Sequence, residues 1–242
     1  VHVYAIKGSW PNRVRTYPED PECDFLSRVR ELVAWRDEHA PGKQVWVTEF
    51  GWDAHLPGGA PLQQGVPIDR RPSTISRVQQ AQYLVRGYLL FAASGVDRAY
   101  MFWYRDEGPS KGLHNADGLI SAGLKQPAFF ALRSLRRTLG DYRFSLVLAE
   151  GPGSAYACLF RAPGGRACVA FWNGTRGGEP VEYALDLEKA GLGNARLTRA
   201  VELTLEDTPE PSVEATVTGG VLKVRAVGTP RLAFFSVASE HG

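Results

Sequence analysis

The acidic residue Glu49 stands at the end of an apolar segment, where a carboxylate could carry chemistry. The segment QVWVTEFGWD, residues 44–53, begins with the pattern of a buried strand and runs directly into Glu49. An isolated ionised carboxylate in an apolar interior is costly, so Glu49 needs either a structural partner or an open cleft. In a cleft, a carboxylate can act as a nucleophile or as a general base.

Three further side chains are predicted to lie on the same side as Glu49. Because side chains alternate along a strand, Glu49 shares a face with Val45 and Val47. The same alternation places His2 and Tyr4 on one face of the first strand, and Trp103 on one face of the third. If these faces match, His2, Tyr4, Glu49 and Trp103 project into one cleft. A carboxylate, a hydroxyl, an imidazole and a flat indole suit a sugar, which needs hydrogen bonds at its rim and an aromatic platform beneath.

Each of these residues also has a purely structural interpretation. Glu49 is also consistent with a salt-bridged acid at a strand end, and His2 with a core histidine whose hydrogen bonds are satisfied. Taken singly, Trp103 is typical of a core residue, and Asp106 and Glu107 are typical of a solvated loop. The combination of the residues favours a site more than any single member does.

The elements that must position these residues alternate between strand and helix. This order predicts right-handed crossovers and a parallel sheet, in which the loops after the strands carry the active site. Long loops rich in Gly and Pro or in polar residues follow the second and third strands, at residues 57–72 and 107–122. Apolar periodicity, with glycines as stops, predicts strands at 2–6, 44–48 and 98–104, and helices at 24–38, 73–94 and 126–139.

From about residue 142 the sequence changes to short alternating segments separated by turn residues. Several short strands at this spacing predict an antiparallel β-sandwich. We therefore expect two domains, residues 1–140 and 141–242, packed together without a flexible linker. The predicted strands are RFSLVLA, AYACLFRA, RACVAFWN, VEYALDL, RLTRAVEL, SVEATVT, VLKVRAV and RLAFFSV.

Composition limits the classes of function. The 242 residues are 44% hydrophobic and 22% charged, with a formal net charge of +2, which is typical of a globular chain and gives no sign of a nucleic-acid partner. No apolar run approaches the roughly 20 residues that a membrane helix needs. Three cysteines without a CxxC pair predict no metal cluster, and we expect no metal and no cofactor. Cys158 and Cys168 flank a turn; buried free thiols are favoured, with a disulfide as the alternative.

Four segments resemble one family. The TEFGW stretch at 48–52 is similar to the motif after the seventh strand of clan A glycoside hydrolases, and HVY at 2–4 resembles the His-x-Tyr of their sixth strand. MFWYRDEG at 101–108 is similar to their Trp-bearing eighth strand. GLHNADGLISAGLKQPAFFAL at 112–132 resembles the passage before the last barrel helix of family 39-like members, although Ala116 and Asp117 stand where that pattern has Phe.

The resemblance implies a fold and an activity. The chain would contain strands six to eight of a TIM (β/α)8 barrel, followed by the β-sandwich. Glu49 would be the nucleophile of a retaining glycosidase, and a nearby Tyr hydroxyl would hold it charged. The residues expected to contact a carbohydrate substrate lie in the matching segments: His2, Tyr4, Trp52, Trp103, Asp106 and Asn115. The family also favours a secreted or periplasmic location.

The sequence departs from the family in one respect. In that clan the acid/base is a Glu after Asn at the end of the fourth strand, and the chain contains no Asn-Glu pair. We therefore expect the acid to lie in an N-terminal barrel half, in the same or a separate chain. One alternative is a non-catalytic glycan-binding or scaffold protein. The other is a different α/β enzyme in which Glu49 is a general base.

Overall fold

A computed structural model describes residues 1–55, 59–106, 114–151 and 155–237. The chain divides into two compact units, Val1–Arg133 and Ser134–Gly242. The division falls within helix α3 (Pro127–Leu139), whereas the change of sequence pattern placed the boundary after residue 140. Among the described residues, no helix is both long enough and apolar enough to cross a membrane.

The first unit contains three consecutive parallel segments, as predicted. The N-terminal segment runs parallel to β3 (Trp46–Phe50), because His2 bridges Glu49 and the Val3 N–H donates to the Glu49 carbonyl at 3.0 Å. Strand β3 in turn pairs in parallel with β4 (Arg98–Met101). Helix α1 (Phe25–His39) connects the first segment to the second, and α2 (Arg77–Ala93) connects the second to the third.

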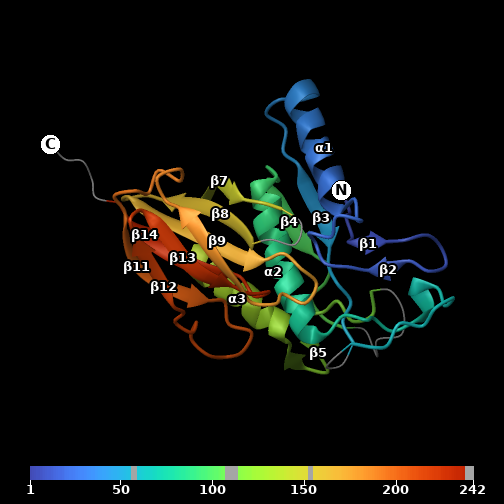
Figure 1. Ribbon diagram of the computed structural model, residues 1–242. Helices are drawn as coiled ribbons and strands as arrows, with labels where there is room; N and C mark the ends of the chain where they lie inside the picture. Colours follow the sequence, from blue (N-terminus) through green and yellow to red (C-terminus); the bar gives the residue numbers. More distant parts are fainter. Residues whose placement is uncertain (56–58, 107–113, 152–154, 238–242) are drawn as a thin grey trace. The chain divides into compact units, whose positions relative to one another are not determined.

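Several short elements were not predicted. Strands β1 (Ile6–Lys7) and β2 (Val14–Arg15) form an antiparallel hairpin, which Figure 1 shows in blue, projecting from the unit. Strands of two residues are too short to give a periodic pattern, so the sequence could not distinguish them from the surrounding loop. The predicted strand over 98–104 ends earlier, at Met101. The other short elements are η1 (Ile68–Arg70), β5 (Ile120–Ser121) and β6 (Leu124–Lys125).

Helix α2 begins later than predicted because Ser76 caps it. The Ser76 side chain accepts from the Gln79 N–H at 3.1 Å, and the Gln79 side chain accepts from the Ser76 N–H at 3.0 Å. This reciprocal capping box satisfies two N–H groups that a helix start would leave unpaired. The prediction that placed the start at residue 73 was therefore wrong, while the predicted glycine stop, Gly95, follows the C-cap residue Ser94 and has a φ of 80°.

Aromatic side chains from α1, β3 and α2 form the core of the first unit. Phe50 packs edge-on against Phe91 at 4.8 Å between ring centroids and against Trp52 at 6.1 Å. Phe25 of α1 contacts both Trp52, at 5.7 Å, and Phe91, at 5.4 Å. The edge-on geometry is the arrangement that aromatic quadrupoles favour. This core holds the strand end that carries Glu49 against two helices.

A charged pair lies inside this unit. Arg86, in the middle of α2, forms an ion pair and a hydrogen bond at 2.8 Å with Glu19, and both side chains are 0% exposed. Buried charges persist only when they are paired and hydrogen-bonded, so the two residues depend on each other.

The second unit is built from two antiparallel sheets. Every strand pairing in its described part is antiparallel, as predicted, in the orders β11-β14-β9-β8-β7 and β10-β13-β12. Apolar residues of both sheets share one core, including Val169 and Phe171 of one sheet and Leu222 and Val224 of the other. The strands are β7 (Arg143–Ala149), β8 (Ala155–Ala162), β9 (Arg166–Asn173), β10 (Val181–Asp186), β11 (Arg196–Glu202), β12 (Ala215–Thr218), β13 (Val221–Ala226) and β14 (Arg231–Ser236).

The two cysteines of the second unit form no disulfide. Cys158 lies opposite Ala170, and Cys168 lies opposite Phe160, so the two thiols are not directly opposed across the hairpin. Both are buried and neither forms a disulfide, which confirms the prediction of buried thiols without a disulfide.

Candidate active site

A β-bulge places Glu49 at the end of its strand. Val47 pairs with Ala99 and Phe50 with Met101, so β3 advances three residues while β4 advances two. The extra residue moves Phe50 onto the buried face with Val47, and leaves the Glu49 side chain 32% exposed. The prediction that Glu49 shares a face with Val47 was therefore wrong, because a bulge interrupts strict alternation.

Two predicted partners reach the Glu49 carboxylate. The Tyr4 hydroxyl donates to Glu49 Oε2 at 3.0 Å, and His2 Nδ1 lies 3.2 Å from the same oxygen. Burial, and then the hydrogen bond to Glu49, raise the pKa of Tyr4 well above its usual value, so the phenol remains a proton donor at all ordinary pH. Among the described residues no lysine or arginine pairs with Glu49, and its ion pair with His2 forms only when the imidazole is protonated.

Trp103 follows the neighbouring strand directly beside the Glu49 motif. The Phe102 N–H donates to the Phe50 carbonyl at 2.7 Å, and a methyl group on Gly51 would overlap the Phe102 carbonyl oxygen. The indole of Trp103 stacks on the Phe102 ring, with centroids 4.6 Å apart. Its Nε1–H is buried without a hydrogen-bond partner in the part of the chain that the structure describes.

We expect Gly51→Ala to disturb this approach of the two backbones. The methyl group would meet a backbone carbonyl, which cannot rotate away, so we expect a loss of about 2–3 kcal/mol in the free energy of unfolding. Gly42→Ala is the control: its methyl group meets nothing within 4 Å, and its φ of +83° predicts a loss of only about 1 kcal/mol. Urea denaturation of both variants measures the difference, and equal losses would contradict the tight approach.

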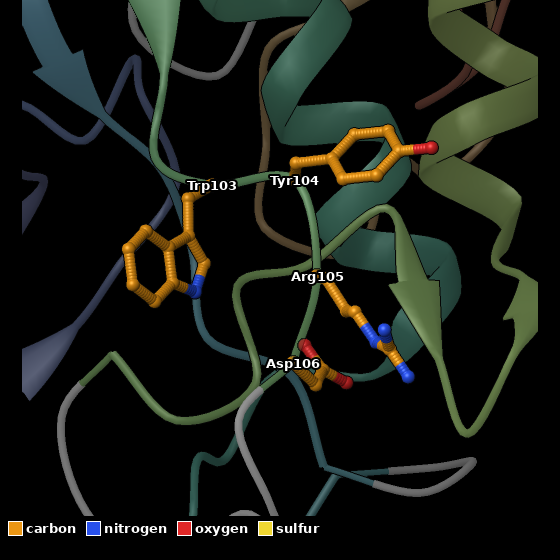
Figure 2. A pocket seen from close by; sticks show the side chains of 4 residues that line it. All are labelled: Trp103, Tyr104, Arg105 and Asp106. Carbon is orange, nitrogen blue, oxygen red and sulfur yellow. The ribbon is translucent and has the colours of Figure 1, made fainter.

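An open hollow lies at the end of β4. It has a volume of about 270 Å³ and is lined by Trp103, Tyr104, Arg105 and Asp106. Figure 2 shows the Trp103 indole and the Tyr104 ring on opposite sides of the backbone. Trp103 therefore lines this hollow on the side away from Tyr104.

Asp106, which was expected to contact substrate, instead binds Arg77 and the backbone of Gly118. Its Oδ2 accepts from Arg77 at 2.5 Å, its Oδ1 accepts from the Gly118 N–H at 2.7 Å, and its side chain is 3% exposed. A carboxylate held in this way ties the chain after β4 to helix α2 and leaves no oxygen for a ligand. Glu107, the other acid of this segment, lies outside the described residues.

Trp52 and Asn115 differ in their placement. Trp52 is 2% exposed, and its Nε1–H donates to the Thr16 carbonyl at 2.7 Å, so it is a core residue and offers no surface to a substrate. The sequence could not separate this role from binding, because both use a tryptophan beside a strand end. Asn115 is half-buried, between His114 and Ala116, in a segment that reaches the site.

Three residues that the sequence analysis did not assign to the site lie in this segment or bind to it: Asp53, His114 and Asp117. Buried Asp53 accepts from Arg15 Nε at 2.7 Å and from the backbone N–H groups of His114 and Ala116 at 2.8 and 3.2 Å. The His114 ring packs on the Tyr4 ring at 4.7 Å, and its Nδ1 lies 2.8 Å from Asp117 Oδ2. The only local signal was an acid directly after TEFGW and a His-x-x-Asp spacing in a loop.

The environment shifts the protonation of His114 and Asp117. Burial, reinforced by the nearby Asp53 charge, raises the pKa of Asp117 to about 7, although the bond to His114 opposes this rise. Burial lowers the pKa of His114, but the hydrogen bond to Asp117 and the two carboxylate charges outweigh it, so the net shift is upward. Since the two groups share a hydrogen bond, they titrate as a pair, which takes up one proton near neutral pH.

Asp53, His114 and Asp117 also have the residue types of a metal site. One ligand atom from each residue can be chosen so that all three lie within 4.8 Å of one another. However, the Asp53 carboxylate already neutralises the buried guanidinium of Arg15, with both side chains almost fully buried. A positive charge in contact with a ligand opposes a second cation, so the cluster fits a hydrogen-bonded support better than a metal centre.

Comparison with solved structures shows that this fold is similar to the folds of glycoside hydrolases of families 39, 51 and 30, which confirms the resemblance at the level of the fold. No family model matches the chain. No curated protein matches it either.

Three solved structures illustrate the likeness. A family 39 glycoside hydrolase from Bacteroides cellulosilyticus WH2 has a TM-score of 0.57 at 18% identity, over 88% of this chain and 38% of that chain. A family 51 arabinofuranosidase from Xanthomonas axonopodis pv. citri has a TM-score of 0.56 at 18% identity, over 98% and 52%. A family 30 subfamily 8 xylanase from Clostridium acetobutylicum has a TM-score of 0.54 at 9% identity, over 81% and 43%. The chain therefore spans only about two fifths to one half of these structures.

Proposed function

We propose that this chain carries the nucleophile side of a retaining glycoside hydrolase, with Glu49 as the nucleophile. The observation that carries the proposal is the Glu49 carboxylate, held by the Tyr4 hydroxyl at 3.0 Å where a parallel strand ends. A nucleophilic carboxylate must remain charged and accessible, and a bulged strand end with a neutral donor meets both needs. The shared fold with clan A glycoside hydrolases supports the same activity.

In the proposed reaction, Glu49 attacks the anomeric carbon of the bound sugar. The bond from that carbon to the leaving oxygen breaks, and an ester between the sugar and Glu49 forms; water then hydrolyses the ester. Tyr4 remains protonated and orients the carboxylate throughout. Trp103, beside the hollow at the end of β4, is the proposed platform beneath the sugar. His2 and Asn115 are proposed to contact sugar hydroxyls.

The acid that protonates the leaving group is proposed to lie outside this chain. A retaining enzyme needs it about 5–5.5 Å from the nucleophile. Asp106 is bound to Arg77 and Asp117 is 1% exposed, so neither is available to a leaving group. We infer that the acid belongs to an N-terminal barrel half, in the same or a separate chain.

An exposed sheet face supports this assignment of the first unit to barrel strands six to eight. Trp46 and Tyr100, on neighbouring strands, are 42% and 46% exposed, and their rings lie 6.1 Å apart. Aromatic pairs exposed on a sheet face are expected where another part of the protein covers that face. Residues 1–140 are then the end of the barrel domain, and residues 141–242 a β-sandwich accessory domain.

Covalent trapping tests the nucleophile without the acid. A 2,4-dinitrophenyl 2-deoxy-2-fluoroglycoside has a leaving group that needs no protonation, while its fluorine slows hydrolysis of the ester. Since the structural neighbours include xylanases and a glucanase, the xyloside and the glucoside are the first probes. We expect release of one dinitrophenolate per chain, an increase in intact mass by one fluorosugar, and a modified peptide containing Glu49.

The control is Glu49→Gln, which should release no dinitrophenolate and gain no mass. Label on another carboxylate would contradict the assignment of Glu49. Binding of these sugars without label, by wild type and variant alike, would instead indicate a non-catalytic glycan-binding protein.

A further inference from the structure

His114 is held in a conformation that few non-glycine residues adopt. Its φ of 69° lies in the left-handed region, which costs a residue with a side chain roughly 1–2 kcal/mol. The cost is offset by the His114 N–H, which donates to buried Asp53 at 2.8 Å, and by Asp53 itself, which Arg15 anchors. Backbone conformations of this kind cluster at functional sites, where the surrounding structure enforces them.

The side chain of His114 is oriented from three directions. Tyr4 packs against one side of the ring at 4.7 Å, and Phe102 meets it edge-on at 5.3 Å. Asp117, whose side chain is 1% exposed, fixes Nδ1 at 2.8 Å. The ring therefore lies between the residue that holds Glu49 and the residue beside Trp103.

This orientation leaves one nitrogen of the His114 ring, Nε2, to bind a ligand. Nδ1 is committed to Asp117, while the His114 side chain is 30% exposed. A buried carboxylate at Nδ1 selects the neutral tautomer that carries its proton there, so Nε2 becomes a hydrogen-bond acceptor. The same arrangement of carboxylate, imidazole and free Nε2 directs histidines toward hydroxyl groups in other enzymes.

The geometry points to His114 as a ligand-binding residue of the Glu49 site, exchanging a hydrogen bond with a sugar hydroxyl through Nε2, and to Asp117 as the residue that positions it. This inference rests on the proposed function, because the ligand is the same sugar. A hydroxyl group both donates and accepts, so the contact survives protonation of the ring, with Nε2–H as the donor.

The groups that face His114 set its titration. Asp117 and Asp53 favour the charged ring, Arg15 opposes it, and Tyr4 remains neutral beside it. Because the pKa of His114 is raised, protonation begins above its usual range, and Nε2 changes from acceptor to donor as pH falls. Asp117→Asn removes the nearest charge and should lower the pKa of His114.

Nitrogen NMR on the ¹⁵N-histidine-labelled 242-residue chain tests the inference, with D-xylose and D-glucose as probes. We expect a saturable shift of the Nε2 resonance of His114 with one of these sugars, while exposed His39 does not respond. His114→Gln assigns the resonance. Asp117→Asn should weaken sugar binding about 2–10-fold, the effect of one hydrogen bond, and reduce the tautomer protonated at Nδ1.

The failures of the two proposals are distinguishable. One outcome would contradict the role of His114 alone: a sugar binds and Glu49→Gln weakens that binding, but the Nε2 resonance of His114 does not shift and His114→Gln binds the sugar as tightly as the wild type. The proposed function would then stand. If Glu49→Gln does not weaken the binding of either sugar, or neither sugar binds, both the proposed function and this inference are contradicted. His39→Gln is the matched control and should bind sugar as the wild type does.

Discussion

Replacing Glu49 with glutamine is expected to reduce glycoside hydrolysis by a factor on the order of 10⁴ or more, because the amide cannot form the ester intermediate. The measurement is kcat for an aryl glycoside, with this chain and the remaining barrel strands present. Glutamine keeps the shape of the side chain and Glu49 is partly exposed, so the free energy of unfolding should change by less than about 1 kcal/mol. Loss of activity without loss of stability is the expected signature of a nucleophile.

Azide provides a second readout. Glu49→Ala should be rescued by azide, which enters the vacated space and attacks the anomeric carbon of an activated aryl glycoside to give a glycosyl azide of inverted configuration. Glu182→Gln is the control, since Glu182 is exposed and its ion pair with Arg225, at 3.8 Å, is long. Unfolding of Glu49→Gln would show that the carboxylate is structural, and unchanged activity would remove it from the mechanism.

Replacing Glu19 with alanine is expected to destabilise the protein by about 3–5 kcal/mol, the largest stability effect of a single substitution that we predict. The substitution leaves the guanidinium of Arg86 fully buried without its carboxylate partner, and water cannot reach it. Chemical denaturation followed by far-ultraviolet circular dichroism measures the loss.

A nearby acid offers the matched control for Glu19. Glu22 pairs with Lys7 at 2.8 Å, but its side chain is 76% exposed, so Glu22→Ala should cost less than about 1 kcal/mol. Similar losses in the two variants would mean that Arg86 finds another partner when Glu19 is absent.

The periodic elements of this chain could be predicted from sequence, and the short ones could not. Alternation located RFSLVLA, AYACLFRA and RACVAFWN with the bounds of β7, β8 and β9, because turn-forming residue types flank each segment in the sequence and each has an apolar face. The hairpins β1–β2 and β5–β6 have two residues in each strand, so local pattern carries no information about them. Their geometry depends on tertiary contacts.

The site was predictable where neighbouring strands form it. Tyr4 and His2 were placed beside Glu49 because strand ends in a parallel sheet meet at one edge. The ion pair that holds Asp106 was not foreseen, because its partner Arg77 lies 29 positions away and no local pattern indicates the pair. His114 was missed for a similar reason: its anchor, Asp53, is 61 positions away.

The extra residue in β3 has a consequence for how this site can change. Two residues of β3 lie between Val47 and Phe50 where β4 has one, and this extra residue helps to leave Glu49 accessible. Point substitutions around the carboxylate can therefore alter its reactivity or its ligand while its location stays fixed. Removing one residue between Val47 and Phe50 would restore regular pairing with β4 and would change the position of the carboxylate relative to Tyr4 and His2. Substitutions and deletions at this strand end would thus act on separate properties: the first on chemistry, the second on whether a site exists.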